Sequence, residues 1–218
     1  MSERRIGVYG GTFDPIHRGH LEVGRAVVRQ FALDELLIVP AHRPPHKTSR
    51  VIADAYHRYA MAAIATLDDE RLKVSTVELE APERPYTFET LERLRNEYGP
   101  QAGLFFVMGA DSFEELNLWR EPGRMLDSAN LIVITRPRHA LELEHLPARF
   151  AARLVDWRGG GDESAAAASA GSVYLTDVVN MDVSSTDIRR RVRDGEPIET
   201  DVPPRVADYI QKYVLYRQ

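Results

Sequence analysis

The 218-residue sequence contains no cysteine. This absence excludes disulfides, thiolate nucleophiles and cysteine zinc sites, and it fits the cytoplasmic location that we expect for the chain. Long apolar runs are missing as well. No stretch approaches the ~20 apolar residues that span a bilayer, and the N-terminus leads into a strand pattern rather than a signal-peptide core. We therefore expect no membrane partner.

An excess of positive charge is also lacking, because the formal net charge is −5 at pH 7. This balance argues against broad binding to nucleic acid. Basic residues nevertheless gather in two short segments, residues 42–47 and 189–193. Two small basic clusters on an acidic protein favour a small phosphorylated ligand over a polyanion, although Arg190, Arg191 and Arg193 can equally form a solvated face.

Several familiar nucleotide and metal motifs are absent from the sequence. The glycines after the first apolar run do not fit the GxGxxG dinucleotide fingerprint, because Tyr9 and Thr12 occupy the second and third glycine positions. The sequence contains neither the GxxxxGK phosphate loop nor the HExxH zinc motif. Any phosphate site must therefore be built in another way.

Residues 7–21, GVYGGTFDPIHRGHL, supply such an alternative. An apolar strand leads into Gly10 and Gly11, a polar turn follows, and His17 and His20 stand where helical spacing begins. Glycines allow close backbone approach to a phosphate, and the free N–H groups of a helix's first turn attract anions. Glycines after a strand are often only a tight turn, but two histidines in the same turn favour function; we expect them to act as two titratable cations.

The segment 10–20, GGTFDPIHRGH, resembles the signature of the HxGH nucleotidylyltransferase superfamily, and residues 184–189, SSTDIR, resemble its second motif. Val183 stands where that motif usually has isoleucine. Segments 44–47, 85–87 and 109–112, together with Trp119, make the chain similar to the bacterial nicotinate-nucleotide adenylyltransferase branch. The resemblance extends over about residues 6–216.

This resemblance implies adenylyl transfer from ATP, with Mg²⁺, to nicotinate mononucleotide, giving deamido-NAD and pyrophosphate. The acceptor phosphate is already anionic, so the reaction needs no general base. The implied catalytic residues are His17, His20 and Arg189. The residues implied for ATP are Gly10, Gly11, Thr12, Phe13, His17, His20, His46, Lys47, Ser185, Thr186 and Arg189, and no protein ligand is assigned to the metal. Those implied for the mononucleotide are Tyr86, Thr87, Gly109, Asp111 and Trp119.

The pattern of elements predicts an α/β fold, a three-layer Rossmann-like open parallel sheet with helices on both faces. Strands are expected at residues 6–9, 36–40, 72–79, 104–108, 131–134 and 173–175. Helices are expected at residues 21–31, 55–67, 88–98, from Asp111 or Ser112 onward, in the second half of 139–153, at 184–195 and at 206–215. We expect one domain, 1–218, with a C-terminal helical part at about 184–218 and a flexible surface loop at 159–172. Both motifs should then lie at the carboxyl edge of the sheet, close together.

Some residues have simpler explanations, and some functions remain open. Thr87 and Asp111 are plausible helix N-caps, and tryptophans such as Trp119 usually belong to the core. The acceptor could instead be nicotinamide mononucleotide, phosphopantetheine or a flavin nucleotide. Less favoured alternatives are a metal hydrolase that uses several of the histidines (His17, His20, His42 and His46) and a nucleotide sensor without activity. The sequence also leaves open whether the chain forms a homo-oligomer.

Overall fold

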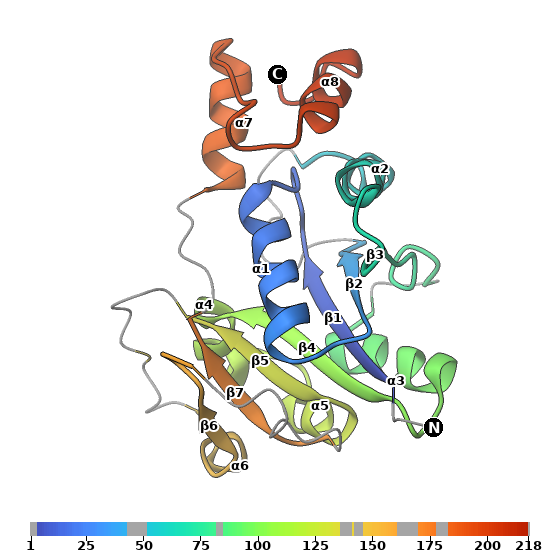
Figure 1. Cartoon of the computed structure of the whole chain (residues 1–218), viewed down its shortest axis with the longest axis vertical. Helices are drawn as coiled ribbons and strands as arrows, with labels where there is room; N and C mark the ends of the chain where they lie inside the picture. Colours follow the sequence, from blue (N-terminus) through green and yellow to red (C-terminus); the bar gives the residue numbers. More distant parts are fainter. Residues whose placement is uncertain are drawn as a thin grey trace.

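The chain folds around a parallel β-sheet (Figure 1). The computed structural model describes residues 4–42, 52–81, 85–135, 141, 146–160, 170–177 and 183–217. Within them, seven strands pair in the order β3-β2-β1-β4-β5-β7-β6, and every pair is parallel. The strands are β1 (Arg5–Gly11), β2 (Glu35–Pro40), β3 (Leu72–Val74), β4 (Gly103–Gly109), β5 (Asn130–Ile134), β6 (Leu154–Asp156) and β7 (Val173–Thr176).

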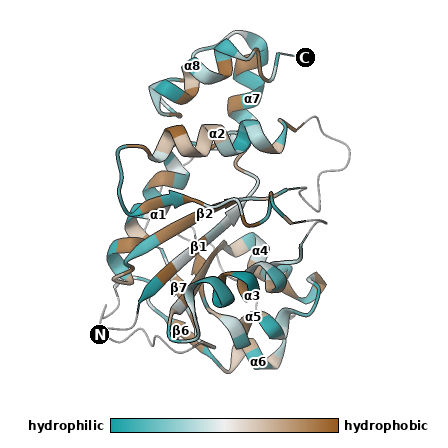
Figure 2. Cartoon of the chain, turned by 90° about the vertical axis from the view of Figure 1, so that its right-hand side faces the viewer, coloured by the Kyte–Doolittle hydropathy of each residue, from teal (hydrophilic) through white to brown (hydrophobic). Residues whose placement is uncertain are grey.

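Helices cover both faces of the sheet, which confirms the predicted three-layer Rossmann-like class. They are α1 (Arg18–Gln30), α2 (Ala55–Thr66), α3 (Thr87–Tyr98), α4 (Ala110–Glu114), α5 (Pro122–Ser128), α6 (Ala148–Ala151), α7 (Ser185–Asp194), α8 (Pro204–Lys212) and the short 3₁₀ helix η1 (Leu116–Leu118). Figures 1 and 2 show α2, α7 and α8 together at one end of the molecule. None of the described helices is both long and apolar enough to cross a membrane.

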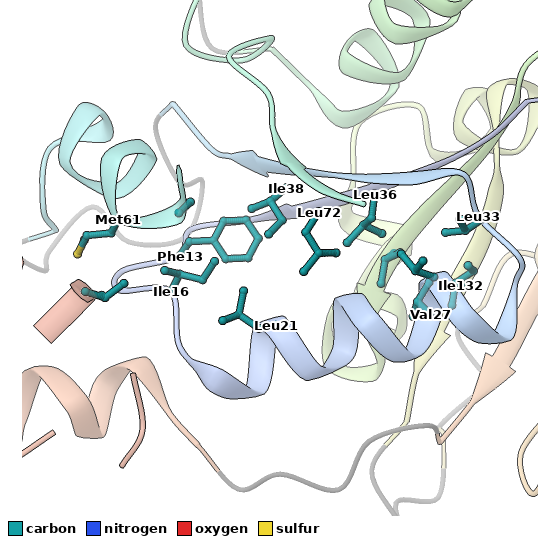
Figure 3. Close-up of a cluster of buried hydrophobic side chains, with 14 of the residues drawn as sticks. Phe13, Ile16, Leu21, Val27, Leu33, Leu36, Ile38, Met61, Leu72 and Ile132 are labelled. Carbon is teal, nitrogen blue, oxygen red and sulfur yellow. The ribbon is translucent and has the colours of Figure 1, made fainter. Parts of the chain in front are cut away.

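Alternation along the central strands divides the core into two layers. In β4, Phe105 and Val107 face the layer under α1, while Phe106 and Met108 face the layer under α3 to α6. Successive side chains of a strand point to opposite faces, so a strand of five apolar residues in sequence must be covered on both sides. Figure 3 shows the first layer, where α1 lays Leu21 and its neighbours against the sheet.

The side of the sheet to which successive strands are added switches between β1 and β4. Strands β2 and β3 extend to one side of β1, and β4, β5, β7 and β6 extend to the other side. The register pairs Tyr9 with Val107, so the carboxyl ends of β1 and β4 reach the same edge next to each other. In open α/β sheets, ligands bind in the crevice at such a switch point. The HxGH segment follows β1 directly, and Gly109 ends β4.

Two strand predictions were wrong in detail. The strand expected at 72–79 ends at Val74, because β3 is an edge strand that pairs only with β2 and the chain then turns. The turn is stabilised by the Glu80 N–H, which donates to the Thr76 carbonyl at 2.9 Å. Strand β6 was not predicted: it is a three-residue edge strand, too short for its pattern to stand out.

The helix boundaries also differ from the predictions. Thr87 is not an N-cap but the first residue of α3; Tyr86 precedes the helix, and the Glu89 carboxylate reaches back to accept the Tyr86 N–H at 2.7 Å. Helix α4 begins at Ala110 and has only five residues. Helix α8 ends at Lys212 rather than near Leu215. Residues 161–169 of the predicted 159–172 loop lie outside the described residues.

Candidate active site

The loop between β1 and α1 turns sharply over a buried aromatic ring. Phe13 has a left-handed backbone (φ 49°) and is only 2% exposed. A Cβ added at Gly11 would lie 2.8 Å from that ring, closer than real Cβ contacts come, so glycine is required there for steric reasons. Gly10 has slightly more room, because an added Cβ would lie 3.3 Å from Phe106. The predicted phosphate loop is therefore tightly packed, and its backbone is held close to the sheet edge.

His17 and His20 lie together at the start of α1. Their rings stack with centroids 3.6 Å apart and an interplanar angle of 25°. The backbone N–H of His17 donates to Nδ1 of His20 at 3.3 Å. Because Nδ1 accepts a hydrogen bond, the neutral His20 ring carries its proton on Nε2, which can donate to a ligand oxygen. The ring is further oriented by an edge contact to Phe13 at 5.0 Å.

The glycine between the histidines makes this stacking possible. A Cβ added at Gly19 would lie 3.1 Å from Nδ1 and 3.2 Å from Cε1 of His17, so any larger residue would press on that ring. The same Cβ would lie 3.7 Å from Cβ of Val183, beside the second motif. Glycine at this position thus serves both the His17 ring and the close approach of the two motifs.

Of the two titratable histidines, His17 does not carry its charge at pH 7 in the ligand-free protein. His17 is only 7% exposed, and burial lowers its pKa to about 4, an effect that the Asp201 carboxylate opposes only in part. The imidazole is thus neutral at pH 7. Its buried Nδ1 has no hydrogen-bond partner within the described part of the chain.

This lowered pKa predicts an acid-sensitive fold. In the unfolded chain His17 titrates near its ordinary pKa of 6.5, so His17 stabilises the fold fully above pH 6.5 and loses that contribution as the pH falls towards 4. The loss should reach up to about 3 kcal/mol of unfolding free energy. Urea denaturation at pH 7.5 and pH 5 should show about 2 kcal/mol of this loss, because the rest is lost only near and below pH 4. His17→Gln should reduce the pH dependence; equal pH dependence in the variant and the wild type would contradict the assignment.

The second motif contacts the loop that precedes α1. The Ser185 hydroxyl donates to the Pro15 carbonyl at 3.0 Å, and Nη1 of Arg189 donates to the Asp14 carbonyl at 2.6 Å. Nη2 of Arg189 donates to Oγ1 of Thr186 at 3.2 Å. These contacts confirm the expected proximity of the two motifs, 170 residues apart in sequence for the Ser185 bond.

The same contacts define which groups remain available to a ligand. The Ser185 hydroxyl proton is already used, so Ser185 would meet a phosphate through its backbone N–H, near the start of α7. The Thr186 hydroxyl accepts from Arg189 and therefore keeps its own proton for donation. Arg189 turns away from the solvent, with its side chain 13% exposed.

The rest of the basic cluster faces acidic side chains. Arg190 pairs with Asp187 at 2.8 Å and with Asp194 at 3.2 Å along the exposed side of α7. Arg191 pairs with Asp201. Arg190 therefore matches the interpretation as a solvated face, whereas the Arg191 side chain is only 20% exposed.

The loop also contains a buried carboxylate that the sequence analysis did not assign. Asp14 is 2% exposed; its Oδ1 accepts from the Tyr216 hydroxyl at 2.7 Å and from the Ala53 N–H at 3.2 Å, and its Oδ2 lies 3.6 Å from Arg189. Burial and the Asp14 carboxylate raise the pKa of Tyr216 strongly. Through these contacts Asp14 links the first motif to three other parts of the chain. These are Ala53 before α2, Arg189 in α7, and Tyr216 after α8.

The residues predicted for the acceptor lie around the ends of α3 and β4. Tyr86 is 45% exposed, and the Arg120 guanidinium lies 5.6 Å from its ring centre, which brings the start of α3 next to the segment that carries Trp119. Trp119 is half-buried against the second core layer. An added Cβ at Gly109 would meet no atom of the described residues within 4 Å, so the described structure leaves the end of β4 open. Thr87 is half-buried in the first turn of α3, and Asp111 is exposed in the first turn of α4.

Two of the predicted ATP contacts cannot be placed. His46 and Lys47 lie in segment 43–51, outside the described residues. The described chain reaches His42 on one side of this segment and Ile52 on the other.

Comparison with known proteins adds independent evidence. The family model described as cytidylyltransferase-like matches residues 8–191, which include both motifs. A relative from Saccharopolyspora erythraea is 39% identical over 98% of this chain and 90% of its own length, and one from Thermoanaerobacter is 36% identical over 99% and 96%. Both are named as probable nicotinate-nucleotide adenylyltransferases. The chain belongs to the nicotinate-nucleotide adenylyltransferase family. The resemblance inferred from the motifs is confirmed.

A solved structure agrees with the fold of this family member. The nicotinic acid mononucleotide adenylyltransferase of Plasmodium falciparum, complexed with NaAD, superposes with a TM-score of 0.70 over 98% of this chain and 97% of its own. Only 21% of the aligned residues are identical, so the likeness supports the fold rather than individual contacts.

The stacked histidines also argue against a metal hydrolase for this member of the adenylyltransferase family. Imidazole lone pairs lie in the ring plane, so two nearly parallel stacked rings cannot aim nitrogens at one ion. Among the residues that the structure describes, no group of three potential His, Cys, Asp or Glu ligands gathers.

Proposed function

We propose that this chain transfers the adenylyl group of ATP to nicotinate mononucleotide. An oxygen of the mononucleotide phosphate attacks the α-phosphorus, the bond from that phosphorus to the α,β-bridging oxygen breaks, and deamido-NAD and pyrophosphate result. The observation that carries the proposal is the junction of the two motifs at the β1–β4 switch point, where Arg189 and Ser185 bond to the loop before α1. Family membership supplies the substrate class.

The triphosphate is proposed to lie between the starts of α1 and α7. His20 donates from Nε2 to the α-phosphate, where negative charge grows in the transition state. Thr12, the Thr186 hydroxyl and the backbone N–H of Ser185 bind phosphate oxygens, and Arg189 binds the leaving pyrophosphate. Gly10, Gly11 and Phe13 shape the loop that the ATP approaches. Catalysis of this kind rests on positioning and on charge stabilisation.

His17 acts as a buried partner of this arrangement. Its neutral ring stacks on His20 and fixes the orientation of the donor. A bound triphosphate would raise its pKa, because a nearby negative charge favours the imidazolium form. His17 is therefore proposed to become a cation when ATP is bound. His46 and Lys47 are proposed as further phosphate ligands from segment 43–51.

Mg²⁺ is proposed to enter with ATP, bound by phosphate oxygens. The donor set of the site is made of imidazoles, hydroxyls, N–H groups and a guanidinium, which suit anions rather than Mg²⁺. The buried carboxylate of Asp14 is already engaged by Tyr216, Ala53 and Arg189. When bound, the ion would neutralise phosphate charge, and the chain's own groups would hold the phosphates in place.

The mononucleotide is proposed to bind beside the end of β4. The open space at Gly109 leaves room for the ribose phosphate, and Asp111 can accept from ribose hydroxyls. Tyr86, Thr87 and Trp119 are proposed to contact the pyridine ring, which would stack on an aromatic side chain. A cytoplasmic location remains our expectation for this reaction.

Product identification tests this function. The purified chain is incubated with ATP and Mg²⁺ in three separate reactions, with nicotinate mononucleotide, nicotinamide mononucleotide or phosphopantetheine as the acceptor. The products are separated and identified by mass spectrometry. We expect deamido-NAD and pyrophosphate in equal amounts from the first reaction, at the highest rate. Faster turnover of another acceptor would show that this acceptor, rather than nicotinate mononucleotide, is the substrate. No turnover of any acceptor would refute the proposed function.

A further inference from the structure

Arg58 is a fully buried arginine next to the proposed ATP site. It lies in the first turn of α2 and is 1% exposed. Its hydrogen bonds within the described residues all go to backbone carbonyls: Nη1 to Thr12 at 2.8 Å, Nη2 to Ala41 at 2.6 Å and to His42 at 3.1 Å, and Nε to Ala53 at 3.0 Å. One guanidinium therefore joins the loop after β1, the end of β2 and the entry to α2.

This arrangement is costly, and packing alone does not explain it. Burial lowers the pKa of Arg58, because the charged form loses its hydration, and nearby acids such as Asp14 offset only part of that cost. A methionine would fill a similar volume without a charge to desolvate. What only arginine offers is a planar fork of five donors that can hold several carbonyls in fixed directions.

We propose that Arg58 is a positioning residue for adenylyl transfer, an inference that rests on the proposed function. Its bond to the Thr12 carbonyl fixes the peptide plane between Thr12 and Phe13 in the phosphate loop. Since that peptide is trans and planar, the Phe13 N–H points away from Arg58. Nη2 at the same time fixes the point where the chain leaves β2 towards segment 43–51, which carries two proposed phosphate ligands.

Ala53 connects Arg58 to the second motif through hydrogen bonds. Its carbonyl accepts from Arg58 and its N–H donates to Asp14, whose backbone carbonyl in turn accepts from Arg189. A continuous path of hydrogen bonds thus runs from α2 through the first motif to α7. Arg58 does not need to touch the substrate; it sets the positions of groups that do.

Arg95 provides a matched control at the opposite edge of the sheet. It is half-buried in α3 and likewise donates to backbone carbonyls, those of Ala102 at 2.7 Å, Pro100 at 3.3 Å and Ser128. Ala102 precedes β4, so these bonds support the amino ends of the strands, away from the proposed site. Loss of Arg95 should affect stability without affecting catalysis.

The test compares Arg58→Met, Arg58→Lys and Arg95→Met with the wild type, at a temperature at which thermal melts show each to be folded. We expect Arg58→Met to lower kcat by about 10- to 100-fold, the effect of a small misplacement of reacting groups, with KM for nicotinate mononucleotide unchanged within about twofold. Arg58→Lys should recover little, because one ammonium cannot span three segments. Arg95→Met should keep kcat within about twofold.

A double-mutant cycle sharpens the result. If Arg58 acts by positioning the loop that leads to His20, then Arg58→Met should lower kcat by a smaller factor in a His20→Ala background than in the wild type, while Arg95→Met should have the same effect on kcat in both.

Normal kcat in folded Arg58→Met, full recovery by lysine, or an equal loss in Arg95→Met would each overturn the inference. If Arg58→Met does not fold, Arg58→Lys decides alone: wild-type kcat refutes the inference. A wild type that forms no dinucleotide refutes the proposed function instead, and ATP binding measured without acceptor then shows whether Arg58 still supports the site.

Discussion

Replacing His20 by alanine is expected to lower kcat by about 10²–10³, the effect of removing one preorganised donor from a developing charge. The ring is oriented for this role, because Nδ1 accepts the His17 N–H and Nε2 carries the proton that can donate a hydrogen bond. KM for nicotinate mononucleotide should change little, since His20 is proposed to act on the ATP α-phosphate. Initial rates of dinucleotide formation with both substrates saturating measure the effect, and circular dichroism verifies folding.

His57 provides the matched histidine control. It lies on α2, where its Nδ1 is 2.9 Å from the Tyr209 hydroxyl, and it takes no part in the proposed site. His57→Ala should turn over within about twofold of the wild type. Wild-type turnover by folded His20→Ala would remove His20 from the mechanism, and equal losses in the two variants would point to a general effect on α1 and α2.

Replacing Arg189 by methionine is expected to lower kcat by about 10²-fold or more. An arginine that neutralises charge on a transferring phosphoryl group often contributes 10³ or more, and Arg189 is proposed to bind the leaving pyrophosphate. Lysine should not replace it, because the guanidinium holds Asp14 and Thr186 with different nitrogens. Pyrophosphate release, followed by a coupled assay, measures the loss.

The neighbouring Arg190 makes a strict comparison possible. It has the same charge and follows in the same helix, but it pairs with Asp187 and Asp194 on the exposed side of α7. Arg190→Met should keep kcat within about twofold, since exposed ion pairs contribute little. If the two methionine variants lose the same activity, the effect comes from the net charge of the segment rather than from the place of Arg189.

The sequence was sufficient to predict the fold class and the junction of the two motifs. Periodicity located the central strands, and a strand followed by a helix places each motif at the carboxyl edge of a parallel sheet. The weak points were the edges of the sheet. Strand β3 is shorter than its alternating pattern, and β6 has too few residues for a pattern to be visible.

The electrostatics of the site could not be predicted from sequence. The sequence motif is the same whether the His17 ring is exposed or buried. Only the packing around the ring in the folded protein shows that its pKa falls to about 4. The hydrogen bonds that the Ser185 and Thr186 hydroxyls already make likewise depend on how distant segments of the chain come together. Side-chain chemistry indicates what a residue can do, and the fold decides which of its atoms are free.

Arg58 and Tyr216 were missed for a related reason. Neither belongs to a recognisable motif, and an arginine in a helix is normally exposed. The one available signal was that Arg58 occupies a helix close to Met61 and Ala62, two apolar residues that are buried. A charged residue among core positions could have marked a buried hydrogen-bond role.

The central claim is that the segments around His20 and Arg189 act on one ATP molecule, whose α-phosphate is transferred. ATP labelled at the α-phosphate, incubated with Mg²⁺ and nicotinate mononucleotide, tests it most directly. The account predicts that the label appears in deamido-NAD while pyrophosphate is released unlabelled, and that His20→Ala and Arg189→Met both suppress this transfer while Arg190→Met retains it. Label that stays in ATP or appears only in free AMP or ADP, or transfer that survives in either motif variant, would contradict it.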